Sequence, residues 1–181
     1  MKPSSKGSSL LSHFRDVLIL PFTATAIVPY LIYDPGQKLI PRNTIIIIAG
    51  VLIITTGLAL FFMTVFLFKL IGKGTLAPWS PKQKLVIAGP YRFCRNPMIT
   101  GVLFILIGES LILHSTSILI WAGIFFVINT IYFILKEEPD LQKKFGEEYQ
   151  EYKKHVPRWI PNLKPYFSSD RSPPVVLRPK R

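Results

Sequence analysis

A long apolar run over residues 44–71 is the feature that most limits how this chain can fold. Its only charged residue is Lys69, near the end, and about 20 apolar residues let a helix cross the hydrocarbon core of a bilayer. With 49% hydrophobic residues, a soluble domain of 181 residues would have too little interior to bury several such runs. The sequence therefore predicts an all-α integral membrane protein with about four transmembrane helices, near residues 14–33, 44–71, 98–113 and 118–135.

The distribution of Lys and Arg predicts the orientation of these helices, because short basic loops stay on the cytoplasmic side of a membrane. Basic residues lie before the first helix, between the second and third, and from Lys136 onward. Both termini and the central loop are thus expected on the cytoplasmic side, and the short chain with one cysteine is consistent with a prokaryotic inner membrane. The first segment contains Asp16, Pro21 and Pro29, so it is either a full span or an interfacial or re-entrant segment.

The net charge of +12 is the main argument for a nucleic-acid partner, because phosphates attract clustered Lys and Arg. Membrane orientation and attraction to anionic headgroups explain the same charges, so we expect membrane lipids as partners and no nucleic acid. Cys94 is the only cysteine, which excludes a disulfide within the chain and a cysteine metal cluster. No metal site is predicted.

Two basic and aromatic stretches adjoin the last two apolar segments, namely Gly89–Gly101 and Lys136–Pro161. A tight turn at 114–117 would make those segments a C-terminal helical hairpin and bring both stretches to one membrane face. We therefore expect the active site there. Asn96 and Pro97 suit the cap and first turn of the third helix, whose free N–H groups favour an anionic group.

The remaining sequence divides by composition. Residues 1–13 are predicted to be disordered, 14–163 to form a single membrane domain, and 164–181 to be a flexible basic tail. Apolar residues recur at helical spacing within about 140–154, so this cytoplasmic helix either lies on the membrane or closes over a pocket. Glu109, inside the third helix, is either paired near the outer interface or part of the pocket.

Five motifs in a fixed order resemble the isoprenylcysteine carboxyl methyltransferase-like membrane enzymes, to which the phospholipid methyltransferases are similar. The match covers about residues 72–163, and residues 1–71 resemble the family only in being membrane helices. The motifs are Gly89-Pro90-Tyr91-Arg92, Arg95-Asn96-Pro97-Met98 with Gly101, Glu137-Glu138-Pro139, Phe145-Gly146-Glu147-Glu148-Tyr149 and Val156-Pro157-Arg158-Trp159-Ile160-Pro161. The family pattern has His where this chain has Asn96 and Tyr where it has Ile99.

The resemblance implies S-adenosylmethionine as the cofactor and Arg95 and Glu138 as catalytic residues. Glu138, or else Glu137, would hold the amino group of the cofactor's methionine part, and the turn at Asn96 with Arg95 would meet its carboxylate. Tyr91 or Trp159 would pack on the adenine. The residues implied in cofactor binding are Tyr91, Arg95, Asn96, Pro97, Met98, Gly101, Glu137, Glu138, Arg158 and Trp159.

The function expected on this basis is transfer of a methyl group to a lipid-like or lipid-tailed acceptor, a carboxylate or an amine, at the cytoplasmic face. The departures at Asn96 and Ile99 leave a second possibility, a membrane scaffold or sensor that keeps the fold without catalysis. A third is a sterol-reductase-like enzyme that uses NADPH. Cofactor binding and its loss on charge reversal at Glu138 distinguish the three.

Overall fold

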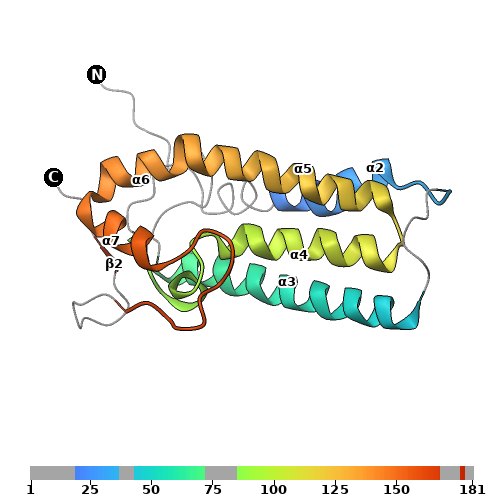
Figure 1. Ribbon diagram of the computed structural model, residues 1–181, viewed down its shortest axis with the longest axis horizontal. Helices are drawn as coiled ribbons and strands as arrows, with labels where there is room; N and C mark the ends of the chain where they lie inside the picture. Colours follow the sequence, from blue (N-terminus) through green and yellow to red (C-terminus); the bar gives the residue numbers. More distant parts are fainter. Residues whose placement is uncertain (1–18, 37–42, 72–84, 168–175, 178–181) are drawn as a thin grey trace, which may run out of the picture.

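The computed structural model describes residues 19–36, 43–71, 85–167 and 176–177. The predictions for the amino terminus before residue 19, for the loop at 72–84 and for residues 168–175 and 178–181 of the tail lie outside the described residues. Three helices run along the length of the molecule (Figure 1), namely α3 (Thr44–Ile71), α4 (Pro97–Ile112) and α5 (Thr116–Tyr132).

The starts of these helices follow from local hydrogen bonds. Asn43 begins α3, because its side-chain oxygen accepts from the Ile45 N–H at 2.9 Å. Ser115 begins α5 by accepting from the Ile118 N–H at 3.4 Å. Between α4 and α5 the chain reverses over three residues, and His114 has a positive φ of 53° in that turn.

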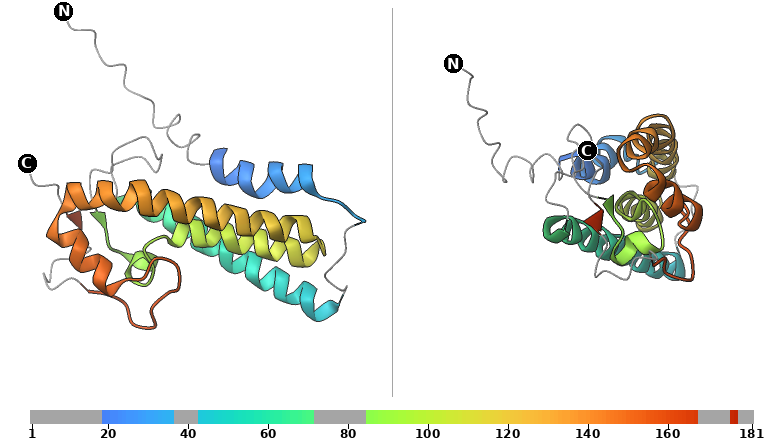
Figure 2. Two further views of the ribbon diagram at one scale, coloured as in Figure 1. Left: turned by 45° about the horizontal axis from the view of Figure 1, so that its top comes forward. Right: turned by 90° about the vertical axis from the view of Figure 1, so that its left-hand side faces the viewer.

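A shorter apolar helix, Ile19–Ile32, lies beside α5 (Figure 2). It includes the π-helical turn η1 (Thr23–Ile27) and the helix α2 (Val28–Ile32). The indole N–H of Trp121 in α5 donates to the carbonyl of Ala24 at 3.0 Å, which fixes the two helices to each other.

Two helices are long and apolar enough to cross a membrane, by length and composition, within the described residues: Thr44–Leu67 and Thr116–Phe145. Only 17% of the most apolar window of each is buried inside the protein, and many of their large apolar side chains are exposed. The helices Ile19–Ile32 and Pro97–Ile112 are also apolar but shorter. This pattern is that of a membrane protein, in which lipid covers the apolar exterior.

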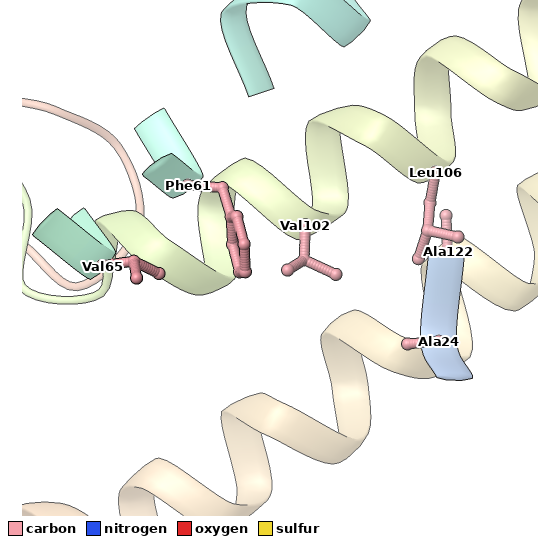
Figure 3. Packing of buried hydrophobic residues seen from close by; sticks show 6 residues of the cluster. All are labelled: Ala24, Phe61, Val65, Val102, Leu106 and Ala122. Carbon is pink, nitrogen blue, oxygen red and sulfur yellow. The ribbon is translucent and has the colours of Figure 1, made fainter. Parts of the chain in front are cut away.

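The core lies where the N-terminal helix, α3, α4 and α5 converge (Figure 3). Leu106 of α4 is fully buried there, and Val102 is 1% exposed. The buried cluster comprises Ala24, Phe61, Val65, Val102, Leu106 and Ala122.

Glycines set the distance between α3 and α4. A Cβ on Gly57 would lie 2.7 Å from the carbonyl oxygen of Gly101, and a Cβ on Gly101 would lie 2.8 Å from that of Gly57. The second pair is Gly50 with Gly108. A Cβ on Gly50 would lie 3.0 Å from the carbonyl oxygen of Gly108, and a Cβ on Gly108 would lie 2.7 Å from that of Gly50. Such backbone contact between helices is typical of membrane proteins, where small residues line the interface. Gly123 of α5 differs from these glycines, because nothing lies within 4 Å of a Cβ at that position.

At one end of the bundle α5 continues without a break through the π-helical turn η3 (Phe133–Glu137) into α6 (Glu138–Phe145). The next helix is α7 (Glu147–His155). The sequence predicted a single helix over about 140–154, and this is wrong because Gly146, with φ of 58°, separates two helices. Figure 1 shows α7 folded back from α6.

The same end contains the short connecting elements. The 3-10 turn η2 (Gly89–Arg92) leads toward α4, and the strand β1 (Leu85–Val86) precedes it. β1 pairs antiparallel with β2 (Val176–Leu177), with Leu85 opposite Leu177. These elements, together with α6 and α7, surround the candidate site.

Candidate functional site

The carboxylate of Glu138 lies at the centre of the site, at the start of α6. Its Oε1 accepts from Arg95 Nη1 at 3.0 Å and from Arg158 Nε at 2.6 Å. Its Oε2 lies 2.8 Å from Lys153 Nζ. The meeting of the two polar stretches that the sequence predicted is confirmed by this contact between Arg95 and Glu138. One carboxylate therefore faces three cations.

Burial and hydrogen bonding shift the pKa of Glu138 in opposite directions. The residue is 5% exposed, and the loss of solvent raises its pKa. Hydrogen bonds from Arg158 and Lys153, with the positive charges of Arg95 and Arg158, outweigh that effect and hold the pKa below its usual value. Glu138 is therefore ionised in this arrangement at neutral pH.

Residues 156–167, which we call the C-terminal segment, carry Arg158 into the site. Hydrogen bonds hold this segment on the turn before α4: the Arg95 N–H donates to Pro157 O, the Asn162 N–H to Phe93 O and the Tyr166 N–H to Arg92 O, at 2.9–3.0 Å. Cys94 is 2% exposed, and its thiol lies 3.2 and 3.3 Å from the carbonyl oxygens of Arg158 and Trp159. The thiol of Cys94 thus makes a local contact that helps to hold the C-terminal segment on this turn.

A small cavity of about 40 Å³ lies beside the ion-pair cluster. Apolar, aromatic and charged side chains share its wall, which includes the acid pair Glu137 and Glu138 and the guanidinium of Arg95. Arg95 Nε is buried and finds no hydrogen-bond partner among the described residues. A volume of this size admits a few water molecules. The lining residues are Leu85, Val86, Tyr91, Arg95, Asn96, Phe133, Glu137, Glu138, Leu141, Tyr149 and Tyr152.

Three tyrosines of the cavity wall have phenol groups with raised pKa values. Burial raises the pKa of Tyr149 to about 12, and the neighbouring carboxylate of Glu138 adds to this. Burial also raises the pKa of Tyr91 and Tyr152. Tyr152 Oη donates to the carbonyl of Tyr91 at 2.6 Å, and Arg95 Nη1 donates to Tyr149 Oη at 3.4 Å. These phenols therefore stay neutral and act as hydrogen-bonding groups at physiological pH.

Half of the residues implied in cofactor binding line the cavity: Tyr91, Arg95, Asn96, Glu137 and Glu138. The other five do not. Arg158 contacts the cluster through Glu138, and Trp159 packs with its ring centroid 5.2 Å from that of Phe126 and 5.7 Å from that of Phe133. Pro97 forms the first turn of α4, Met98 packs against the core cluster, and Gly101 contacts α3.

Asn96 differs from its expected local role. It stands before Pro97 as expected, but its side chain makes no capping hydrogen bond, because its backbone ψ of 54° is not that of a usual cap. Its carbonyl instead accepts from the N–H and the hydroxyl of Thr100, both at 3.0 Å. The side chain of Asn96 lines the cavity.

The sequence did not assign Tyr149, Tyr152 and Lys153 to the site. The apolar periodicity of residues 141–152 was the available signal, because it places Tyr149 and Tyr152 on the buried face of α7. Lys153 had no such signal. Glu109 lies near the opposite end of α4 from Arg95 and does not line the cavity.

The structure thus defines a class of protein: a helical membrane protein with an ion-pair cluster and a small aromatic cavity at one end of its bundle. The family described as phospholipid methyltransferase matches residues 45–148. The chain belongs to this family. The matched region begins in α3, earlier than the motifs at 72–163 indicate, and ends before the C-terminal segment.

Relatives agree with this assignment. Protein-S-isoprenylcysteine O-methyltransferase from Mus musculus is 33% identical over 89 residues, which is 47% of this chain and 30% of the mouse protein. The enzyme of the same name from Rattus norvegicus matches equally well. A protein of Haemophilus influenzae, described as uncharacterized, is 38% identical over 65 residues, or 35% of this chain and its own full length. The matched part is therefore less than a third of the two mammalian enzymes.

Proposed function

We propose that this protein transfers a methyl group from S-adenosylmethionine to a lipid-like or lipid-tailed acceptor. The observation that carries the proposal is the contact of 3.0 Å between Arg95 and Glu138, which joins two motifs 43 residues apart beside one cavity. The family membership of residues 45–148 and the outward-facing apolar helices support the same conclusion.

The side chains present fit the cofactor in their chemistry. Glu138 offers a carboxylate for an ammonium group, Arg95 offers a buried N–H without a partner among the described residues, and Tyr91 offers an aromatic face. When bound, S-adenosylmethionine supplies a methyl group already activated by its sulfonium. No nucleophilic side chain of the protein is needed for this chemistry, because the acceptor itself attacks the methyl group. Its residues have to bind, orient the two reactants and exclude water.

The cavity of about 40 Å³ is too small for a nucleoside, so its wall has to open on binding. Arg158 and Lys153 occupy the carboxylate oxygens that an incoming ammonium group needs. We infer that these two cations leave Glu138 when the cofactor enters. Arg95, which is held by the backbone contact with Pro157, stays to meet the cofactor's carboxylate.

The acceptor enters from the bilayer and the cofactor from the cytoplasm. In this arrangement α3, α4, α5 and the N-terminal helix are the four spans, and the end that holds Glu138 is cytoplasmic. A carboxylate acceptor would be held by Arg95 or Arg92, and an amine acceptor would have to reach the methyl group unprotonated.

Calorimetry on the purified protein tests the proposal. S-adenosylmethionine and its demethylated product should bind, NADPH should not, and Glu138→Gln should lose affinity. The matched control is Glu151→Gln, because Glu151 is half exposed on α7 and pairs with Lys154 and His155 outside the cavity. Transfer of labelled methyl groups is then measured with prenylated thiol acids, membrane phospholipids and small amines. If the protein neither binds S-adenosylmethionine nor transfers labelled methyl groups, the proposal that it is a methyltransferase is refuted. Equal binding by both variants would refute the role of Glu138.

A further inference from the structure

The C-terminal segment presents large apolar side chains outward. Leu163 is fully exposed, Ile160 is 80% exposed and Phe167 is 65% exposed. Backbone hydrogen bonds to the turn at residues 92–95 lie on both sides of Ile160 and Leu163 and directly before Phe167, so they fix the backbone that carries these side chains. Large apolar side chains that stay in water lose the stabilisation that burial would give them. A covering partner is therefore expected.

Contacts with α5 show the depth at which this segment lies. Trp159 packs on Phe126 and Phe133. The helix has no charged residue from Thr116 to Leu135, and its first charge is Lys136. At about 1.5 Å per residue, Phe126 lies about 15 Å and Phe133 about 4.5 Å before Lys136 along the helix axis. The segment thus reaches back beside the apolar part of the helix.

The adjoining surface of α5 and η3 faces outward and is apolar. Val127, Ile128, Ile131 and Ile134 are each between 45% and 56% exposed. In Figures 1 and 2 the chain after α7 loops out beside the start of α4 and then returns toward the end that holds α6 and α7. Trp159 therefore lies beside the apolar part of the helix, and the exposed Ile160 and Leu163 follow it closely along the chain.

Basic groups accompany these apolar side chains. Lys164 follows Leu163 and is exposed. The guanidinium of Arg92 lies 4.8 Å from the ring centroid of Phe167. Cations beside apolar and aromatic side chains are the combination that binds the headgroup region of an anionic membrane.

We propose that the C-terminal segment is a re-entrant membrane contact: Ile160, Leu163 and Phe167 insert among lipid acyl chains while Lys164 and Arg92 meet the headgroups. This inference rests on the placement of α5 in the membrane under the proposed function. The same segment carries Arg158 to Glu138, so a membrane contact of the segment would also bear on the position of Arg158 in the site.

Fluorescent labelling of single introduced cysteines tests the contact. The full-length protein is reconstituted in vesicles of phosphatidylcholine and phosphatidylglycerol, and a small bimane label is attached at Leu163→Cys. Ile128→Cys on α5 is the lipid-facing reference, and Lys154→Cys is the reference in water, with its side chain 70% exposed on α7. The native Cys94 is buried, and the unsubstituted protein measures its background labelling.

Lipids that carry a nitroxide near the top of the acyl chain should quench the label at 163 nearly as strongly as that at 128. Iodide in solution should quench the label at 163 several-fold less than that at 154. If the label at 128 is quenched by lipid and the label at 163 behaves like that at 154, the membrane contact of the C-terminal segment is refuted. The placement of α5 in the membrane is then still supported.

Other outcomes separate the remaining possibilities. If the label at 128 is not quenched by lipid, the placement of α5 in the membrane fails, and the proposed function fails with it. If the label at 163 is shielded from iodide in detergent as well, and a cross-linker at this position joins two chains, the segment is covered by a second copy and the lipid contact is refuted. Leu163 is fully exposed, so the labelled variant is expected to fold.

Discussion

Replacing Gly57 by Ala should separate α3 from α4 and destabilise the protein. The added Cβ would lie 2.7 Å from the Gly101 carbonyl oxygen, 3.0 Å from the Ile105 nitrogen and 3.0 Å from the Phe104 Cβ. Ordinary contact begins at 3.4 Å, so the helices have to separate by 0.7 Å, which is 3.4 minus 2.7. Because two of the three obstructing atoms are backbone, no side-chain rotation relieves the overlap. Overpacking of this kind costs about 1–3 kcal/mol.

Gly123→Ala is the matched control, because nothing lies within 4 Å of a Cβ at that position. Both substitutions gain the same intrinsic helix propensity, so their difference in free energy of unfolding isolates the steric cost. The assay is unfolding in mixed micelles titrated with dodecyl sulfate and followed by circular dichroism. Gly57→Ala should be less stable than Gly123→Ala by about 1–3 kcal/mol.

The double variant Gly57→Ala with Gly101→Ala sharpens the test. One separation of the helices relieves both contacts, so the combined loss of stability should be smaller than the sum of the two single losses. Equal stability of Gly57→Ala and Gly123→Ala, or a fully additive double variant, would contradict the register described for α3 and α4.

Three further predictions concern the site and its support. Glu138→Gln leaves Arg95 buried without its carboxylate, so it should cost about 3–5 kcal/mol of unfolding free energy, against about 0–1 kcal/mol for the exposed Glu151→Gln. The lowered pKa of Glu138 means that its stabilisation is present above the ordinary carboxyl pKa of about 4.3 and is lost as pH falls below it, so acid titration should destabilise the unsubstituted protein more than Glu138→Gln. Tyr152→Phe leaves the Tyr91 carbonyl without its phenol donor and should cost about 1–3 kcal/mol in the same micelle assay, and no change would argue against that bond.

Helix positions were largely predictable because strong local signals mark them. The predicted helix at 44–71 coincides with α3, and the predicted helix at 98–113 differs by one residue at each end from α4, which starts at Pro97. Pro97 has no N–H to satisfy in the first turn, which makes that start visible in the sequence. The tight turn between two apolar segments predicted that the stretches holding Arg95 and Glu138 meet, but not that these two side chains contact each other.

The other contacts of the site had no local signal. A single glycine inside a helical pattern is usually tolerated, so the break at Gly146 could not be distinguished from a continuous helix. The C-terminal segment has no periodicity, and its hydrogen bonds to residues 92–95 depend on tertiary folding. For this reason the sequence implied Arg158 in cofactor binding but did not reveal that Arg158 and Lys153 share one carboxylate with Arg95.

The π-helical turn η3 determines which side chain reaches the site. Each residue of an α-helix rotates the next side chain by about 100°, and a π-helical turn accommodates one additional residue. Phe133, at its start, faces Trp159, whereas Glu138, just after it, faces Arg95. If the same residues were wound as regular α-helix, with none removed, Glu138 would be turned about 100° away from its cations, although every charged group of the cluster would still be in the chain.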